Sequence, residues 1–170
     1  MKDPTQATPV SRRLGGEASY WTMRSYLMTW LAEGKDTGGR FALVEVVARQ
    51  GTEPPPHAHA NEDEAYYILQ GEMTFHVGGQ TIEAGAGDYV WLPRGVQHAP
   101  VAKTPEVRVM VLITPAGLEG AFKQVSEPAQ ATTLPPLPEE PPDMEQMQQV
   151  LAVFEAYGLE FALPSVQEQP

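Results

Sequence analysis

The sequence contains no cysteine at all. This absence excludes disulfide bonds, thiolate metal sites and cysteine nucleophiles together, and it leaves imidazole and carboxylate groups as the available metal ligands. It also fits a reducing compartment. The four histidines and the acidic residues are therefore the first places to look for chemistry.

Positive charge is also scarce, with 11 lysines and arginines against 22 acidic residues and a formal net charge of −11. The basic residues form no run longer than Arg12-Arg13. Such a surface is repelled by phosphate backbones and by anionic lipid, so we expect neither nucleic acid nor a membrane as a partner.

Long hydrophobic runs are missing as well. No segment approaches the roughly 20 apolar residues that span a bilayer. The first 16 residues, MKDPTQATPVSRRLGG, lack the apolar core of a secretory signal. These features predict a cytoplasmic protein.

Short runs of β-branched and aromatic residues fill the middle of the chain, and the 15 glycines and 17 prolines are scattered along the sequence, some of them between such runs. Gly78-Gly79 separates two runs as a tight hairpin would. This pattern predicts an all-β fold with a closed or sandwiched antiparallel sheet. The runs between residues 41 and 114 read FALVEVVA, EAYYILQ, EMTFHV, QTIEA, DYVWLP and EVRVMVLIT.

The flanking segments differ in character from this central part. We expect a flexible arm at residues 1–19 and the β-barrel at 20–127. We expect a proline-rich linker at 128–142, followed at 143–170 by a helix and tail that pack on the barrel or on a dimer partner. Within the barrel, residues 20–32 predict an early strand or a cap, and 33–40 a loop.

The C-terminal helix is predicted from a cap and an apolar stripe. Asp143 is a suitable N-cap, with Gln146 three residues on, and Gly158 follows the run as a terminator. The stripe repeats at a spacing of three to four residues. It consists of Met144, Met147, Leu151 and Phe154.

Three of the four histidines, with one glutamate, fall in two stretches that indicate a metal site. His57 and His59 are two residues apart, so on a strand both imidazoles point to the same face. Glu64 opens the next run, and we expect the two strands to pair so that the carboxylate meets both imidazoles. The turn at 93–95 sends His98 onto a further strand, where it can supply a third imidazole.

The remaining histidine and the other acidic residues nearby receive no metal role. His76 alternates with Phe75 on its strand, so it is expected to face outward. Glu62 and Asp63 are expected to be solvated carboxylates of a turn.

Three neutral nitrogens and one carboxylate suit several divalent transition metals, namely Fe, Mn, Co, Ni, Cu or Zn. In a six-coordinate ion this set leaves two positions for exchangeable ligands. The net charge near +1 favours an anionic ligand such as an enolate or a carboxylate. The sequence therefore predicts one such ion per chain without naming the element.

The spacing of these residues resembles the cupin family. The first cupin motif is matched without a gap or a substitution, and the second is matched except at its last position. There Ala102 replaces an asparagine that is not a metal ligand in the family. The first motif is carried by Gly51, His57, His59, Glu64 and Gly71, and the second by Gly87, Pro93, Gly95 and His98.

The resemblance implies a single cupin barrel, also called a double-stranded β-helix or jelly roll, with a C-terminal α-helix. Three further stretches resemble small bacterial cupins similar to quercetin 2,3-dioxygenase. They are DTGGRFALVEV before the first motif, LITPAGLEGAFKQV after the barrel, and AYGLEF near the end.

If this resemblance holds, the chain is a metal-dependent dioxygenase of a flavonol or a similar enolisable or phenolic compound. The resemblance implies a homodimer, the substrate and O2 as partners, and Glu64 as both ligand and general base. Tyr66 and Ile68 alternate with Glu64, and Phe75 has similar parity. These three residues line either the pocket or the ordinary barrel core.

Other functions stay open, because the cupin scaffold supports several chemistries. The alternatives are an oxygenase of another phenolic compound, a non-redox metal-dependent isomerase, a metal-free epimerase and a non-catalytic module that binds a small molecule. A sugar-phosphate substrate would favour a basic cluster, and only Arg94 lies near the motifs. A regulator would need a DNA-binding helix pair, which the sequence does not predict.

Overall fold

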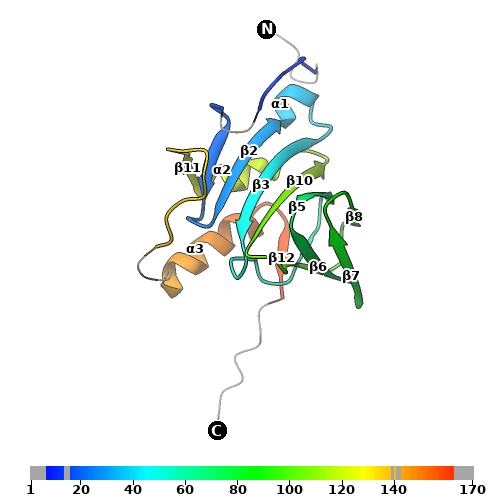
Figure 1. Ribbon diagram of the computed structural model, residues 1–170. Coiled ribbons are helices and arrows are strands. Elements are labelled where there is room, and N and C mark those ends of the chain that lie inside the picture. The colour runs from blue at the N-terminus through cyan, green and yellow to red at the C-terminus, as the bar shows by residue number, and fades with distance from the viewer. Residues whose placement is uncertain (1–6, 14–15, 139, 141–142, 163–170) are drawn as a thin grey trace.

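Two antiparallel sheets pack face to face in the computed structural model, which describes residues 7–13, 16–138, 140 and 143–162 (Figure 1). The larger sheet has the order β11 (Ser126–Pro128), β1 (Ser19–Thr22), β2 (Tyr26–Ala32), β3 (Ala42–Arg49), β10 (Glu106–Thr114), β5 (Asp63–Gln70) and β8 (Tyr89–Leu92). The smaller has the order β12 (Leu159–Phe161), β4 (His57–His59), β9 (His98–Ala102), β6 (Glu72–Val77) and β7 (Gln80–Gly85). The all-β prediction is confirmed.

The core lies between the two sheets and follows from alternation along the strands. In β10, every second residue from Val107 to Ile113 is buried, so one face of the strand is apolar and faces inward. Each fully buried large side chain contributes about 1.5–3 kcal/mol relative to its exposed state. The largest such side chains on the strands are Trp30, Phe75, Leu27, Ile68, Leu92 and Ile113.

The segment 20–32 forms a hairpin of two strands. β1 and β2 pair antiparallel, and the turn between them holds Met23 and Arg24 at φ of 50° and 53°. Left-handed backbone is uncommon for residues with a Cβ atom, so Met23 and Arg24 do not indicate a turn from their residue types.

Residues 33–40 were expected to be a loop, but they contain the one-turn helix α1 (Gly34–Thr37). Glu33 and Asp36 form a reciprocal capping box at its start, and Gly38 ends it in the left-handed conformation. The capping side chains stabilise a turn that composition alone could not indicate.

The described parts of the predicted arm and linker both lie against the body. In the arm, the Thr8 amide donates to the Asp36 carbonyl over 2.6 Å. In the linker, Pro135 is fully buried and its carbonyl accepts a hydrogen bond from Arg49 Nη1 over 2.9 Å. Residues 1–6, 14–15, 139 and 141–142, which these two segments also include, lie outside the described residues.

The predicted C-terminal helix is present as α3 (Met144–Glu155), and the Gln146 amide donates to Asp143 Oδ1 over 2.8 Å at its start. The Phe154 ring packs on the ring of Phe122 in α2 (Glu119–Gln124), and the two ring centroids are 4.9 Å apart. Met144, by contrast, is 75% exposed. Only the C-terminal end of the stripe therefore packs on the barrel (Figure 1).

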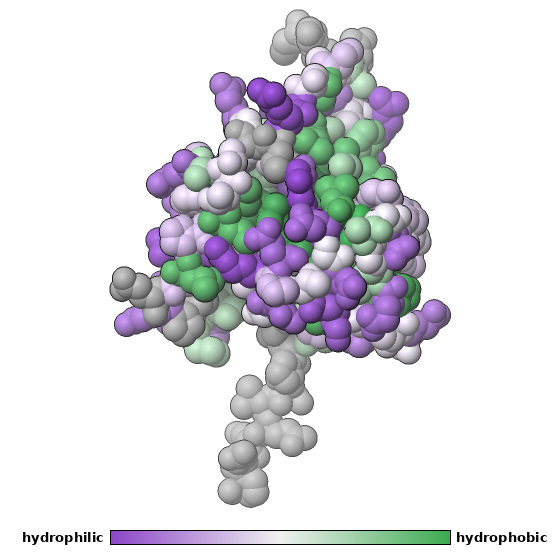
Figure 2. Space-filling view, viewed as in Figure 1, coloured by the Kyte–Doolittle hydropathy of each residue, from purple (hydrophilic) through white to green (hydrophobic). Residues whose placement is uncertain are grey.

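The helices are short, and none among the described residues has the length and apolarity needed to cross a membrane. Figure 2 shows that the face of the larger sheet toward the viewer mixes apolar areas with charged and polar side chains.

Candidate metal centre

Three imidazoles converge where two strands of the smaller sheet lie side by side. β4 carries His57 and His59, and His57 is directly opposite His98 of β9 in the strand register. One ligand atom from each of the three histidines lies within 4.8 Å of the other two, and all three side chains are buried. The predicted same-face arrangement of His57 and His59 therefore holds, and the turn at 93–95 delivers His98 to them.

Glu64 reaches the histidines from the opposite sheet. Its Oε2 atom lies 3.7 Å from His59 Nε2 and 3.7 Å from His98 Nε2. The expected antiparallel pairing of the Glu64 strand with the histidine strand was wrong, because β5 pairs with β8 and β10 and β4 pairs with β9 and β12. The carboxylate meets the imidazoles across the barrel interior.

Backbone carbonyls fix two of the three imidazole rings. The His57 Nδ1–H group donates to the Pro55 carbonyl over 2.9 Å, and the His98 Nδ1–H group donates to the Val96 carbonyl over 3.0 Å. A carbonyl can only accept, so the proton sits on Nδ1 and the Nε2 lone pair is free to bind an ion. This is the arrangement that a histidine ligand requires.

Burial and mutual repulsion keep two rings in the neutral form that binds metal. Burial first, then the neighbouring charges of His98 and His59, lower the pKa of His57 to about 3. Burial also lowers the pKa of His98. For His59, burial acts in the same direction, but Glu62 and Glu64 outweigh it and its pKa is raised. Burial raises the pKa of Glu64.

The buried polar atoms that lack a hydrogen-bond partner indicate that a cation fits here. Buried donors and acceptors are nearly always paired, and an unpaired charge in the interior is costly. In the described part of the chain, the unpaired buried side-chain atoms all belong to this cluster. They are His59 Nδ1 and Nε2, Glu62 Oε2, Glu64 Oε2 and His98 Nε2. Imidazole nitrogens with carboxylate oxygens suit a divalent transition metal, and the donor set does not select the element.

Glu62 does not behave as the solvated turn residue that was expected. It is 5% exposed, and its Oε2 atom lies 3.7 Å from His59 Nδ1. Its neighbour Asp63 does lie nearer the surface, where it accepts a hydrogen bond from Arg94 Nη2 over 2.8 Å. Glu62 is buried because the turn packs beneath the C-terminal segment, where Asn61 Nδ2 donates to the Tyr157 carbonyl over 3.0 Å.

Ala102, which replaces the asparagine of the second motif, lies at the end of β9 in the apolar core and is 2% exposed. Its amide donates to Glu53 Oε1 over 2.9 Å, and its carbonyl accepts from Gln50 Nε2 over 3.2 Å. Two long side chains therefore hold this backbone position, and alanine fills the core without burying an amide.

The three predicted pocket residues lie in the barrel interior. Ile68 and Phe75 are fully buried, whereas Tyr66 is partly exposed. The Tyr66 and Phe75 rings meet edge to face, with centroids 5.1 Å apart, and link the two sheets. Burial, and then the charge of Glu64, raises the pKa of Tyr66 well above its ordinary value, so its hydroxyl stays neutral.

Sequence reasoning missed the strand that flanks the histidines on their other side. β12 pairs with β4, placing Leu159 opposite His59 and Phe161 opposite His57. The Phe161 and His57 rings have centroids 5.9 Å apart. A three-residue strand after a helix carries too little alternation to be found in the sequence.

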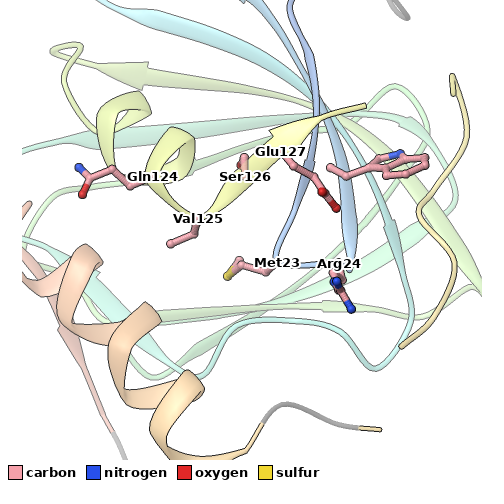
Figure 3. A pocket seen from close by; sticks show the side chains of 7 residues that line it. Met23, Arg24, Gln124, Val125, Ser126 and Glu127 are labelled. Atoms are coloured by element: carbon pink, nitrogen blue, oxygen red, sulfur yellow. The ribbon is translucent and has the colours of Figure 1, made fainter. Parts of the chain in front are cut away.

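Other features lie apart from this cluster. His76 is exposed on β6, as expected. A shallow cleft of about 250 Å³ lies between the β1–β2 turn and the α2–β11 segment. Figure 3 shows Met23 and Arg24 from the turn and Gln124 to Glu127 from the other segment at this cleft, which no strand of the histidine cluster lines.

The fold and the site together define a class of protein. The Cupin domain family matches residues 43–115, the segment that includes all three histidines and Glu64. Residues 43–115 of this chain thus match a cupin domain, and the predicted cupin fold is confirmed. Its histidine cluster is a site that can bind a metal ion.

Particular relatives can then be compared. The chain is 26% identical to quercetin 2,3-dioxygenase of Bacillus subtilis (strain 168) over 105 residues, which are 62% of this chain and 31% of that protein. The chain spans only 31% and 54% of the lengths of the curated relatives that it matches.

Solved structures share the fold at lower identity. Ectoine synthase from P. lautus has a TM-score of 0.57 and 22% identity, covering 79% of this chain and 96% of that one. A nucleoside dehydratase from Streptomyces has a TM-score of 0.52 and 14% identity, covering 73% and 95%. At these identities the likeness concerns the fold alone, and the different activities agree with a scaffold that supports several chemistries.

Proposed function

We propose that this chain is a metal-dependent cupin dioxygenase that acts on a flavonol or a similar enolisable phenolic compound, with O2 as co-substrate. The observation that carries the proposal is the position of Glu64, whose Oε2 atom lies 3.7 Å from two of the three clustered imidazoles. The similarity to a quercetin 2,3-dioxygenase supports the choice of substrate class.

In this proposal His57, His59 and His98 hold the ion through nitrogen atoms, and Glu64 completes the ligand set. A bound divalent ion supplies Lewis acidity that lowers the pKa of a hydroxyl group coordinated to it. The ion's affinity for oxygen anions also favours a substrate that binds as its enolate.

Glu64 is suited to accept the proton of such a hydroxyl. Burial raises the pKa of this carboxyl, which makes it a stronger base than an ordinary surface glutamate. Glu64 belongs to β5 of the larger sheet, whereas β4 belongs to the smaller sheet. The carboxylate can therefore approach a ligand that lies between the two sheets. Glu64 is therefore proposed as both ligand and general base.

Aromatic and apolar side chains near the cluster suit a planar aromatic substrate. Tyr66 and Phe75 lie on the strands β5 and β6, and Phe161 lies beside His57 on β12. Tyr66 keeps a neutral hydroxyl that can donate a hydrogen bond. With Ile68, these residues are proposed to form the walls of the substrate site.

Turnover by the purified protein tests the proposal. The protein is loaded in turn with Fe, Mn, Co, Ni, Cu and Zn, and quercetin absorbance and released carbon monoxide are followed under air. We expect at least one metal form to consume quercetin with equimolar carbon monoxide, and Glu64→Gln to lower kcat about 100-fold or more. Full metal occupancy without turnover of any flavonol would sink the proposal.

The matched control for Glu64→Gln is Glu83→Gln, which alters a glutamate of β7 outside the cluster. This variant is expected to keep the kcat of the unaltered chain. An equal loss in both variants would show that the effect of Glu64→Gln is not specific to the site.

A further inference from the structure

The three clustered histidines are not held in the same way. The Nδ1–H groups of His57 and His98 donate to backbone carbonyls within 3.0 Å. His59 has no such carbonyl, and its Nδ1 atom is buried without a hydrogen-bond partner. A ring without a fixed Nδ1 proton can place that proton on either nitrogen, and only one of the two tautomers leaves Nε2 free to bind an ion.

The atom that faces His59 Nδ1 belongs to Glu62. Glu62 Oε2 lies 3.7 Å away, is itself buried, and has no hydrogen-bond partner. On its other side, His59 Nε2 faces Glu64 Oε2, also at 3.7 Å. The His59 imidazole therefore lies between two carboxylates. Glu64 faces its Nε2 atom within the cluster, and Glu62 faces its Nδ1 atom on the other side of the ring.

We infer that Glu62 is the positioning residue of the metal site: its carboxylate accepts a hydrogen bond from the His59 Nδ1–H group and thereby directs His59 Nε2 toward the ion. The inference rests on the proposed metal site but not on the proposed substrate. A closure of about 0.5 Å brings the Glu62–His59 pair into hydrogen-bond range. Carboxylate partners of this kind make an imidazole a stronger ligand, and their loss typically weakens metal affinity 10–100-fold.

The surroundings of His59 leave Glu62 as the acceptor for its Nδ1–H group. His59 lies at the end of β4, and its own carbonyl accepts a hydrogen bond from the Gly95 amide over 2.8 Å. Asp63 is occupied by Arg94 at the surface. Glu62 is left as the acidic side chain of this turn that is buried against the cluster.

Cobalt binding to the full chain tests this role without any substrate. The dissociation constant of Co(II) is measured by competition with a chromophoric chelator, and the visible absorption of bound Co(II) reports the ligand geometry. Glu62→Gln and Glu62→Ala are expected to weaken Co(II) binding at least tenfold and to change the visible spectrum. Glu62→Asp, which keeps the charge on a shorter side chain, should recover part of the affinity.

The control is Glu72→Gln, which removes the same charge from an exposed position on β6. It should leave both the Co(II) affinity and the spectrum unchanged. If Glu62→Ala fails to fold, the near-isosteric Glu62→Gln carries the test. Unchanged affinity and spectrum in Glu62→Gln, or equal weakening in Glu72→Gln, would overturn the inference.

The outcomes separate this inference from the proposed function. Weakened Co(II) binding in the Glu62 variants, in a chain that turns over no flavonol, supports the positioning role and contradicts only the dioxygenase. Flavonol turnover by the unaltered chain, with unchanged Co(II) binding in the Glu62 variants, supports the dioxygenase and contradicts only the positioning role. An unaltered chain that binds no Co(II) would overturn both.

Discussion

At the scale of single residues, burial keeps two of the three clustered imidazoles, His57 and His98, in the neutral form. The low pKa of His57, about 3, means that an incoming cation displaces no proton from this ring at neutral pH. His59, with its raised pKa, differs because two carboxylates favour its charged form. A metal ion satisfies the same carboxylates in place of that proton.

Replacement of a single ligand tests the cluster directly. In His57→Ala, the ion loses one of its three imidazoles, so we expect the metal content of the purified chain to fall by about tenfold or more. Elemental analysis by mass spectrometry measures this. His76→Ala is the matched control, because His76 is exposed on β6 and lies outside the cluster. Equal metal content in the two variants would contradict the site.

Phe75 tests whether the interior next to Tyr66 is filled core or open pocket. The ring is fully buried. If its surroundings are packed core, Phe75→Ala lowers the free energy of unfolding by about 3–5 kcal/mol. Urea denaturation of the metal-free chain measures this difference. A loss below about 1 kcal/mol would instead show that the ring borders open space.

At the scale of elements, the sequence predicted which face a side chain takes better than which strand it lies beside. Alternation placed His57 and His59 on one face and Glu64 on an inward face, and the structure agrees. It could not predict that Glu64 belongs to the other sheet, because pairing depends on partners far along the chain. Glu62 was misread for the same reason, since distant residues of the C-terminal segment bury its turn.

Short elements were also beyond prediction. Neither α1 nor β12 spans enough residues for a period to be recognised, and both are stabilised by contacts outside themselves. The cupin motifs supplied what periodicity could not, because their spacing joins the residues of two separate strands.

β12 is expected to hold the histidine strand in place. β4 is paired with β9 through a single residue pair, His57 with His98, whereas β12 pairs along its whole length. Glu160→Pro removes a backbone N–H group from β12 at an exposed position, so it should disturb the ladder without removing a core side chain. We expect the Co(II) affinity to fall about tenfold or more.

Glu160→Gln is the control for this substitution, since it keeps the backbone N–H group and the size of the side chain. Its Co(II) affinity should equal that of the unaltered chain. If Glu160→Pro binds Co(II) as tightly as Glu160→Gln, β12 does not position the histidines.

At the scale of the whole molecule, the described part of the arm joins the body through a charged pair. Arg12 Nη1 lies 2.6 Å from Asp36 Oδ2, and Asp36 is largely buried. The homodimer implied by the cupin resemblance stays a prediction, which light scattering during gel filtration checks. Within the segment 20–32, Leu27, Met28 and Trp30 are buried within the chain, so these side chains do not contribute to such an interface.

The arm contact predicts a dependence of stability on pH. The Arg12 guanidinium, with help from the Glu33 amide, holds the pKa of Asp36 below its ordinary value. A lowered pKa in the folded state stabilises the fold above the unfolded value of about 3.9 and loses this effect as pH falls through the folded value. We expect Asp36→Asn to cost about 1 kcal/mol at pH 7.

This difference between Asp36→Asn and the unaltered chain should stay level from pH 7 to about pH 5 and shrink below about pH 4. Urea denaturation at a series of pH values measures it. Arg12→Gln, which removes the other partner, should show the same dependence in a smaller form. A difference that is independent of pH down to pH 2.5 would contradict the assignment.

The pairing of β12 with β4 has a consequence for how the chain is made. The ribosome produces residues 57–59 about 100 residues before residues 159–161, which is an interval of about 5–20 s at ordinary rates of synthesis. During that interval the histidine strand lacks its outer neighbour. The nascent chain is therefore expected to hold metal weakly until its C-terminal strand emerges, so that metal loading is a late event in the biogenesis of this protein.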